Sequence, residues 1–359
     1  MRIRTQAVCG LALLIVTIAG CAASRPENDQ IQSWINGQGA SPGGYSTAQR
    51  AVSQNGDTKR SPDGKPNEFD FSHPRVDDFV AQFQTRLRGF FTGALSRSGR
   101  YVPRMTTILE KEGVPPELAY LPLIESGFRE HAVSRAGAVG PWQLIPGTGR
   151  RYGLRIDRYV DERRDPVKST QAAARYLKDL HDMFGDWHLS LAAYNTGEGN
   201  ISRILEKGRA GDFWEMSDRG YLHQETEDYV PEFLAALHIA ETPEAYGFEA
   251  PAQETLHYDL VKVKRPLQLD TVARLSGSSP GEIKELNPAL HRGVIPPQGY
   301  SVRLPKGTKE TFQVALASYV PPPPPARTKH RAAAKRQGKH VSHKRTATKH
   351  RHSTRHHTA

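Results

Sequence analysis

The sequence predicts a mainly α-helical protein, followed by a small α+β module of strand-helix-helix-strand (βααβ) order and a disordered basic tail. Three observations indicate this. Apolar residues recur at helical spacing over residues 75–240, where no stretch alternates as a strand does. After residue 249, short alternating runs flank two helical runs. From residue 327 the chain has 11 Lys or Arg, 7 His and no acidic residue, so this part cannot form a packed core.

Residues 1–20 have the features of a lipoprotein signal peptide. Arg2 and Arg4 precede an apolar run, residues 8–19, that is too short to cross a bilayer as an ordinary helix. The following Ile-Ala-Gly-Cys sequence ends at Cys21 and matches the lipoprotein processing box, in which that cysteine becomes the lipidated first residue. An ordinary secretory signal with an incidental cysteine is the alternative.

Lipidation of Cys21 predicts a membrane anchor of acyl chains. Ala22, in place of Asp, is typical of lipoproteins sent to the outer membrane of Gram-negative bacteria, where they face the periplasm. Because Cys9 leaves with the signal peptide, no thiol remains for a disulfide or a metal. Residues 21–74, rich in Ser, Gly, Gln, Asn and Pro, predict a flexible tether. The alternative is that the aromatic residues of segment 67–73 pack on the folded part.

The next region, residues 75–248, is predicted to be nearly all helix. Its helices are expected near residues 75–90, 102–112, 115–126, 166–184, 189–194 and 225–240. Gly113 suits the left-handed position after a helix. Asp165 before Pro166 is typical of a helix N-cap, and the helix that follows is expected to run until Gly185.

Glu125 is the candidate catalytic acid. It borders the apolar face of the helix that Pro115 and Pro116 open, and Gly127 can end this helix beside a cleft. That face consists of Leu118, Leu121, Ile124 and Phe128. Burial disfavours a charged carboxylate and raises its pKa, as a proton donor near neutral pH requires. A solvated glutamate on an amphipathic helix is the alternative.

Four motifs give this region a family resemblance. They are LAYLPLIESGF (118–128), AGAVGPWQLIPGTGRRYGL (136–154), LAAYNTGEGN (191–200) and ETEDYVPEFLA (225–235). In their order and spacing the chain resembles the lytic transglycosylases of the soluble-lytic-transglycosylase (goose-lysozyme-like) superfamily, most closely the membrane-bound D type. The resemblance implies a lysozyme-like catalytic domain that cleaves the β-1,4 bond between N-acetylmuramic acid and N-acetylglucosamine in peptidoglycan.

The resemblance also implies the mechanism. Most glycosidases use two carboxylates, but in this family one Glu, here Glu125, acts as acid and then as base. The C6 hydroxyl of the sugar attacks the anomeric carbon and forms 1,6-anhydro-muramic acid. An internal nucleophile needs orientation rather than a second protein group. The substrate-binding residues implied by the matching motifs are Ser126, Gln143, Tyr194, Asn195 and Tyr229.

Two positions next to these residues leave alternatives open. Trp142 could stack on a sugar ring or belong to the core. Pro141 stands where the family usually has a large apolar residue, so the local backbone is uncertain from the sequence. The hydroxyl of Ser126 could equally be structural.

A hydrolytic muramidase or an inactive peptidoglycan-binding scaffold are the alternative functions. A muramidase would need a second carboxylate or a positioned base. The carboxylates Glu130, Asp161, Glu162, Asp165 and Glu198 all lie in polar or turn-like stretches, and none is favoured. No metal-ligand spacing and no phosphate-binding loop occurs in this region, so no cofactor and no metal are predicted.

The βααβ module, residues 255–307, is similar to a LysM carbohydrate-binding module. Its predicted core is Leu269, Val272, Ala273, Ile283, Leu286 and Leu304. The match is degenerate, because the usual Gly-Asp-Thr before the first helix is replaced in residues 267–271. Glycan binding and inert packing both remain open.

Residues 320–359 form a proline spacer and the basic tail. The formal charge of residues 327–359 is +11, and the whole chain is also +11, so the rest is neutral in sum. The signal peptide argues against nucleic acid as a partner. The expected partners are peptidoglycan glycan strands, the membrane through the lipid anchor, and anionic envelope polymers for the tail.

Overall fold

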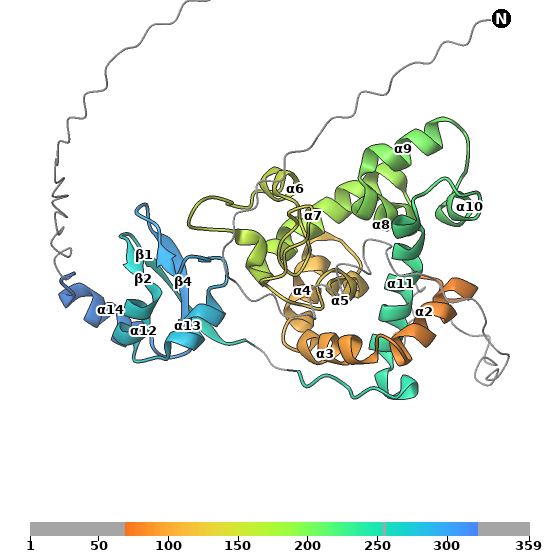
Figure 1. Ribbon diagram of the computed structural model, residues 1–359. Helices are drawn as coiled ribbons and strands as arrows, with labels where there is room; N and C mark the ends of the chain where they lie inside the picture. The colour runs from red at the N-terminus through yellow and green to blue at the C-terminus, as the bar shows by residue number, and fades with distance from the viewer. Residues whose placement is uncertain (1–68, 254–255, 322–359) are drawn as a thin grey trace, which may run out of the picture. The chain divides into compact units, whose positions relative to one another are not determined.

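The computed structural model describes residues 69–253 and 256–321 (Figure 1). The predicted signal peptide, Cys21, most of the tether and the basic tail lie outside these residues. Within the described residues, no helix combines the length and the apolar character needed to span a bilayer.

The described chain begins with two aromatic residues that pack in the core. Phe69 and Phe71 are 1% and 8% exposed, so the alternative that this segment packs on the folded part holds for them. Helix α2 (Pro74–Gln84) and helix α3 (Arg88–Ser98) follow. One helix was predicted here, but the backbone breaks at Thr85, which has φ −118° and ψ −98°.

Helix α4 (Val102–Glu112) has the predicted bounds and ends at Gly113 with φ 75°. The predicted helix before the acid is divided into a 3-10 helix, η1 (Pro116–Tyr120), and a short α-helix, α5 (Pro122–Glu125). Pro122 explains the division, because a proline inside an α-helix lacks the amide donor and its ring collides with the carbonyl four residues earlier. The predicted apolar face is nevertheless buried.

The predicted long helices are confirmed. They are α7 (Pro166–Phe184), α8 (Trp187–Thr196) and α11 (Gln224–Glu241). Three shorter α-helices and one 3-10 helix were not predicted. The α-helices are α6 (Pro146–Arg151), α9 (Glu198–Glu206) and α10 (Phe213–Asp218), and the 3-10 helix is η2 (Glu162–Arg164). A 3-10 helix, η3 (Pro243–Tyr246), follows α11.

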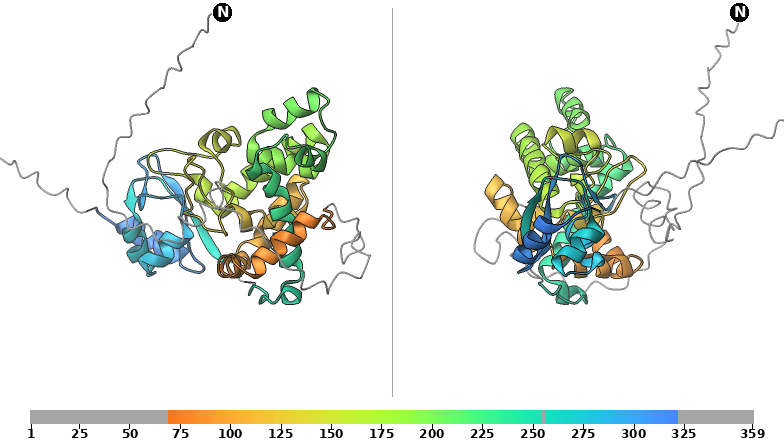
Figure 2. Two further views of the ribbon diagram at one scale, coloured as in Figure 1. Left: turned by 45° about the vertical axis from the view of Figure 1, so that its right-hand side comes forward. Right: turned by 90° about the vertical axis from the view of Figure 1, so that its left-hand side faces the viewer.

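Helix α11 lies centrally in this helical domain. It packs against α2, α8, η1 and α5, while α7 packs against α4 and α8. In the left view of Figure 2, α11, coloured green to teal, runs past the orange α2. The short α5, which ends at Glu125, packs against α11 and α3.

The βααβ module also has the predicted order. Strand β1 (Tyr258–Val263) pairs antiparallel with β4 (Tyr300–Pro305), and helices α12 (Leu269–Ser276) and α13 (Pro280–Leu286) lie between them in the chain. All six predicted core residues are buried. The pair of two-residue strands β2 (Leu267–Gln268) and β3 (Val294–Ile295) and the helix α14 (Lys309–Ser318) were not predicted.

Candidate active site

The four sequence motifs meet at one cleft. A cavity of about 360 Å³ is lined by Glu125 from α5, by the turn-rich segment 134–148, by Tyr176 in the middle of α7, by the end of α8 with the start of α9, and by the start of α11. We call segment 136–144 the cleft wall. Each motif thus contributes residues that lie far apart in the chain, as a substrate cleft requires.

Glu125 is the last residue of α5, and its side chain faces this cavity. The hydroxyl of Tyr229 donates a hydrogen bond of 2.5 Å to Glu125 Oε1. Burial raises the pKa of Glu125 to about 7; the negative charge of Glu225 acts in the same direction, and the hydrogen bond from Tyr229 opposes them. A carboxyl with this pKa is partly protonated at neutral pH and can donate its proton.

The chain turns sharply after the acid. Gly127 and Phe128 both have φ 59°, and this left-handed backbone ends α5. Ser126 is 5% exposed, and its hydroxyl donates to the carbonyl of Pro141 at 2.8 Å. Its hydroxyl therefore ties the end of the acid's helix to the cleft wall, and Ser126 is not among the residues that line the cavity.

The cleft wall is held against a neighbouring loop. At Gly140, which has φ 85°, an added Cβ would lie 1.9 Å from the carbonyl oxygen of Arg163, so the two backbones are in direct contact. Gln143 has φ 44°, lines the cavity, and donates from Nε2 to the carbonyl of Gly140 at 2.7 Å. The unusual Pro141 fits this turn, and Gln143 still reaches the cavity.

Trp142 does not contact the cavity. Its side chain is 0% exposed, and Nε1 donates to Thr170 Oγ1 at 2.9 Å. The prediction that Trp142 stacks on a sugar is wrong, because a ring without exposed surface cannot meet a ligand; the alternative, a core tryptophan, holds. Its carbonyl accepts a hydrogen bond of 2.7 Å from the hydroxyl of Tyr194, which lines the cavity.

The opposite side of the cavity carries a second carboxylate that was not predicted. Asn195 lines the cavity and accepts a hydrogen bond of 2.8 Å from Thr226. Glu225, next to Thr226, also lines the cavity, and burial raises its pKa while Asn195 opposes that shift. The sequence contained a signal for it, because Glu225 lies four residues before Tyr229 and so on the same face of α11.

The other carboxylates considered from the sequence are mostly structural. Glu130 accepts a hydrogen bond from Tyr101, Asp161 pairs with Arg163, and Asp165 caps α7. Glu198 is the exception, because it lines the cavity. A backbone hydrogen bond at its own residue lowers its pKa, with help from Tyr176 and Arg151, so it is ionised at neutral pH. Across residues 69–253 and 256–321, no three His, Cys, Asp or Glu side chains are grouped as metal ligands.

Two family matches cover the two folded parts. Residues 106–217 match the transglycosylase SLT domain, and residues 257–320 match the LysM-like domain of lytic transglycosylase MltD. Membrane-bound lytic murein transglycosylase D of Escherichia coli K12 is 33% identical over 322 residues, which are 86% of this chain and 70% of that protein. Membrane-bound lytic murein transglycosylase C of Haemophilus ducreyi is 27% identical over 42% of this chain and 43% of that protein. Among solved structures, the 70 kDa soluble lytic transglycosylase of Escherichia coli matches 43% of this chain and 25% of its own, with 23% identity and a TM-score of 0.34.

Proposed function

Because the chain belongs to the family of membrane-bound lytic murein transglycosylase D and is a lytic transglycosylase of peptidoglycan, we propose that Glu125 alone supplies both acid and base for the reaction. One observation carries this proposal. Glu125 is a half-buried carboxyl at the cleft, and its desolvation raises its pKa to about 7, so both of its protonation states are available near neutral pH.

The proposed reaction proceeds in two steps. Protonated Glu125 donates its proton to the glycosidic oxygen between N-acetylmuramic acid and N-acetylglucosamine, and the bond from that oxygen to the anomeric carbon breaks. The C6 hydroxyl of the muramic acid then attacks the anomeric carbon, and the Glu125 carboxylate takes the hydroxyl proton. The product is a 1,6-anhydro ring, and Glu125 is again protonated. An intramolecular attack of this kind needs only that the sugar be oriented.

The residues around Glu125 suit distinct roles in this reaction. Tyr229 donates a hydrogen bond that stabilises the carboxylate formed after proton transfer. Gln143 and Asn195 present amide groups to the cavity and would bind the N-acetyl sugars, and Tyr194 would lie against the sugar next to the acid. Glu225, opposite the cleft wall, would accept a hydrogen bond from a sugar hydroxyl or amide.

A muramidase that uses water is the second candidate, because two further carboxylates, Glu198 and Glu225, line the same cavity. One of them would then act as base for the water molecule. The products distinguish the two reactions, since an anhydro ring is lighter by one water than a reducing end.

The test is mass spectrometry of the products released from purified peptidoglycan by the chain without its signal peptide. Anhydro-muropeptides support the transglycosylase, and reducing ends support the muramidase. Glu125→Gln should release neither. Glu110→Gln, the same change at an exposed position of α4, serves as the matched control and should cleave like the unchanged protein.

We also propose the envelope location and the domain limits. Cys21 would carry the lipid anchor at the outer membrane. Residues 21–74 would be the tether, apart from Phe69 and Phe71 at its end, which pack in the core. Residues 75–248 would be the catalytic domain and residues 255–307 the module. The tail, residues 320–359, would bind anionic envelope polymers. Cys21→Ser should move the protein from the outer-membrane fraction to the periplasm; retention in that fraction would refute the anchor.

A further inference from the structure

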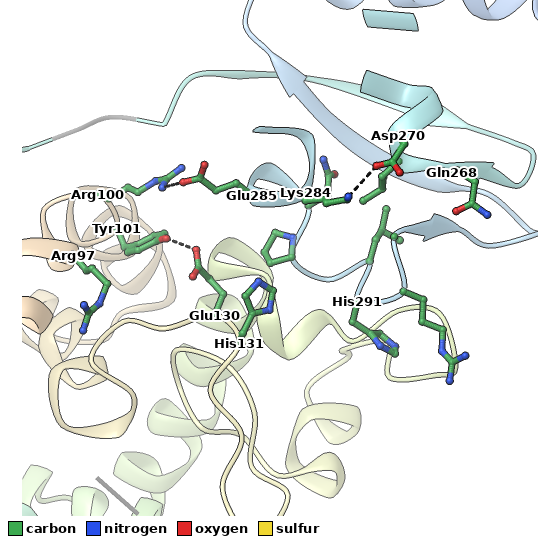
Figure 3. Close-up of a pocket in the computed structure, with 16 residues that line it drawn as sticks. Arg97, Arg100, Tyr101, Glu130, His131, Gln268, Asp270, Lys284, Glu285 and His291 are labelled. Atoms are coloured by element: carbon green, nitrogen blue, oxygen red, sulfur yellow. Dashed lines mark hydrogen bonds and ion pairs between the residues drawn. The ribbon is translucent and has the colours of Figure 1, made fainter. Parts of the chain in front are cut away.

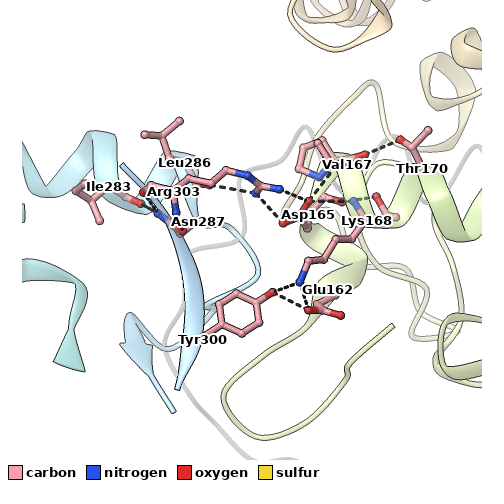
Figure 4. Close-up of polar contacts among 12 residues, drawn as sticks. Glu162, Asp165, Val167, Lys168, Thr170, Ile283, Leu286, Asn287, Tyr300 and Arg303 are labelled. Atoms are coloured by element: carbon pink, nitrogen blue, oxygen red, sulfur yellow. Dashed lines mark hydrogen bonds and ion pairs between the residues drawn. The ribbon is translucent and has the colours of Figure 1, made fainter. Parts of the chain in front are cut away.

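A buried ion pair joins the βααβ module to the catalytic domain. Arg303 on β4 donates from its two terminal nitrogens to the two carboxylate oxygens of Asp165, at 2.6 and 2.8 Å (Figure 4). The two side chains are only 12% and 4% exposed. This forked geometry is the strongest form of a charge-assisted hydrogen bond in proteins, and removing either partner leaves a buried charge alone.

A second group of contacts lies beside this pair. The hydroxyl of Tyr300, also on β4, donates to Glu162 Oε1 at 2.8 Å, and Lys168 Nζ lies 3.0 Å from the same hydroxyl (Figure 4). The backbone amide of Asp161 donates to the carbonyl of Ala289 in the module at 2.9 Å. All of these contacts fall on one short segment of the catalytic domain, residues 161–168.

The module also contacts the catalytic domain at the turn between α3 and α4. Glu285 on α13 pairs with Arg100, and the neighbouring Tyr101 binds Glu130, five residues after the acid (Figure 3). A cavity of about 740 Å³, lined by residues of both parts, lies in this region. Gly99 lies beneath the connecting chain, since an added Cβ would be 2.2 Å from the carbonyl oxygen of Ala252.

The other side of segment 161–168 holds the cleft wall. Arg163 donates from Nη1 to the carbonyls of Gly137 at 2.8 Å and Leu144 at 3.0 Å, and the carbonyl of Arg163 touches Gly140. The same Asp165 that binds the module also caps α7 by accepting from two backbone amides at 3.0 Å. The wall that carries Gln143 is therefore attached to the very segment on which the module docks.

We propose that the βααβ module is a fixed part of the catalytic unit, and that Arg303 and Asp165 are positioning residues that hold the cleft wall in place for Gln143. The consequence for substrate binding rests on the proposed role of Gln143. The module would then support the cleft structurally, whether or not it also contacts glycan. Loss of the ion pair would loosen segment 161–168, and the wall would lose its fixed position over the sugar.

The test uses hydrogen exchange and steady-state kinetics on the chain without its signal peptide. Arg303→Met removes one partner, whereas Asp165→Asn keeps one oxygen for the helix cap but removes the charge and one of the two oxygens that accept from Arg303. In both variants, amide exchange over residues 137–144 should become about tenfold faster or more. KM for soluble peptidoglycan fragments should rise about fivefold while kcat changes less than twofold, because the wall contacts the sugar and not the transferred proton.

Three further proteins sharpen the test. Arg303→Lys keeps the charge but not the forked contact, so it should give intermediate exchange and KM. The double variant Asp165→Asn/Arg303→Met should be no worse than either single variant, since both remove the same contact. Lys306→Met removes an exposed ion pair with Asp259 inside the module and should leave exchange at the wall and KM unchanged.

The proposal is overturned if Arg303→Met leaves both readouts within twofold of the unchanged protein. These readouts are the amide exchange rates of the cleft wall and KM. If that variant does not fold, Asp165→Asn and Arg303→Lys, which both change the same ion pair, decide by the same two readouts. If the unchanged protein fails to cleave peptidoglycan, the proposed function fails. The exchange measurement still decides whether the module holds the wall.

Discussion

Replacing Glu125 by Gln should abolish turnover and, at the same time, stabilise the folded protein at alkaline pH. The pKa of Glu125 is raised from 4.5 to about 7, and each pKa unit corresponds to about 1.36 kcal/mol. Ionised Glu125 therefore destabilises the fold by up to about 3 kcal/mol. Glutamine has nearly the same shape and can still accept the hydrogen bond from Tyr229, but it carries no charge to bury.

The sign of this effect depends on pH. Between pH 4.5 and 7 the folded protein holds a proton on Glu125 that the unfolded chain has lost, so stability falls as pH rises through this window. Below pH 4.5 the carboxyl of Glu125 is neutral in the folded and in the unfolded protein, so it no longer destabilises the fold. The gain from Glu125→Gln should therefore appear at pH 8 and vanish at pH 4.

Urea denaturation of both proteins at pH 4 and pH 8 measures this difference. At pH 4 the two proteins should have the same free energy of unfolding. At pH 8 that of Glu125→Gln should be higher than that of the unchanged protein by about 2–3 kcal/mol. Turnover should fall at least about 10³-fold, since proton donation is lost. The exposed Glu110→Gln should show neither change. An equal stability difference at both pH values, or turnover within tenfold of normal, would show that Glu125 is not a buried catalytic acid.

Three further substitutions test the surroundings of the acid. Tyr229→Phe removes a hydrogen bond to the ionised carboxylate and should shift the alkaline limb of the kcat/KM profile upward by about one pH unit; an unshifted limb would show that this bond does not tune Glu125. Gly140→Ala should destabilise the protein by about 3 kcal/mol or more in thermal unfolding, because its Cβ meets the carbonyl of Arg163 at 1.9 Å and φ is 85°; a normal melting temperature would refute the contact. Trp142→Phe should lower the free energy of unfolding by about 2 kcal/mol with little change in KM. A large rise in KM with unchanged stability would show that Trp142 contacts the sugar.

The helical domain could largely be predicted from the sequence because its signals are local. Asp165 before Pro166, and Gly185 at the other end, define α7, and the apolar spacing of its buried face agrees with both. The bounds of α4 and α13 were predicted to the residue for the same reason. These helices need no distant contact to fix where they begin and end.

Other features depend on contacts that the sequence does not reveal. Pro122 divides the helix before the acid, but a proline at the start of a new helix and one inside an old helix look alike in the sequence. The burial of Trp142 depends on Thr170, far along the chain. Glu225 shares a face of α11 with Tyr229, which its spacing in the sequence indicates, but the packing of α11 decides whether Glu225 reaches the cavity.

Asp165 both caps α7 and pairs with Arg303, and this limits which modules could be fused to the catalytic domain. Asn or Ser could cap α7 equally well, but only a carboxylate can also pair with Arg303 of the module. A carbohydrate-binding module borrowed from another protein would therefore not replace this one by simple fusion. The new module would have to place a guanidinium next to Asp165. Without it, Asp165 would remain a buried carboxylate with no counter-charge at the N-terminus of α7.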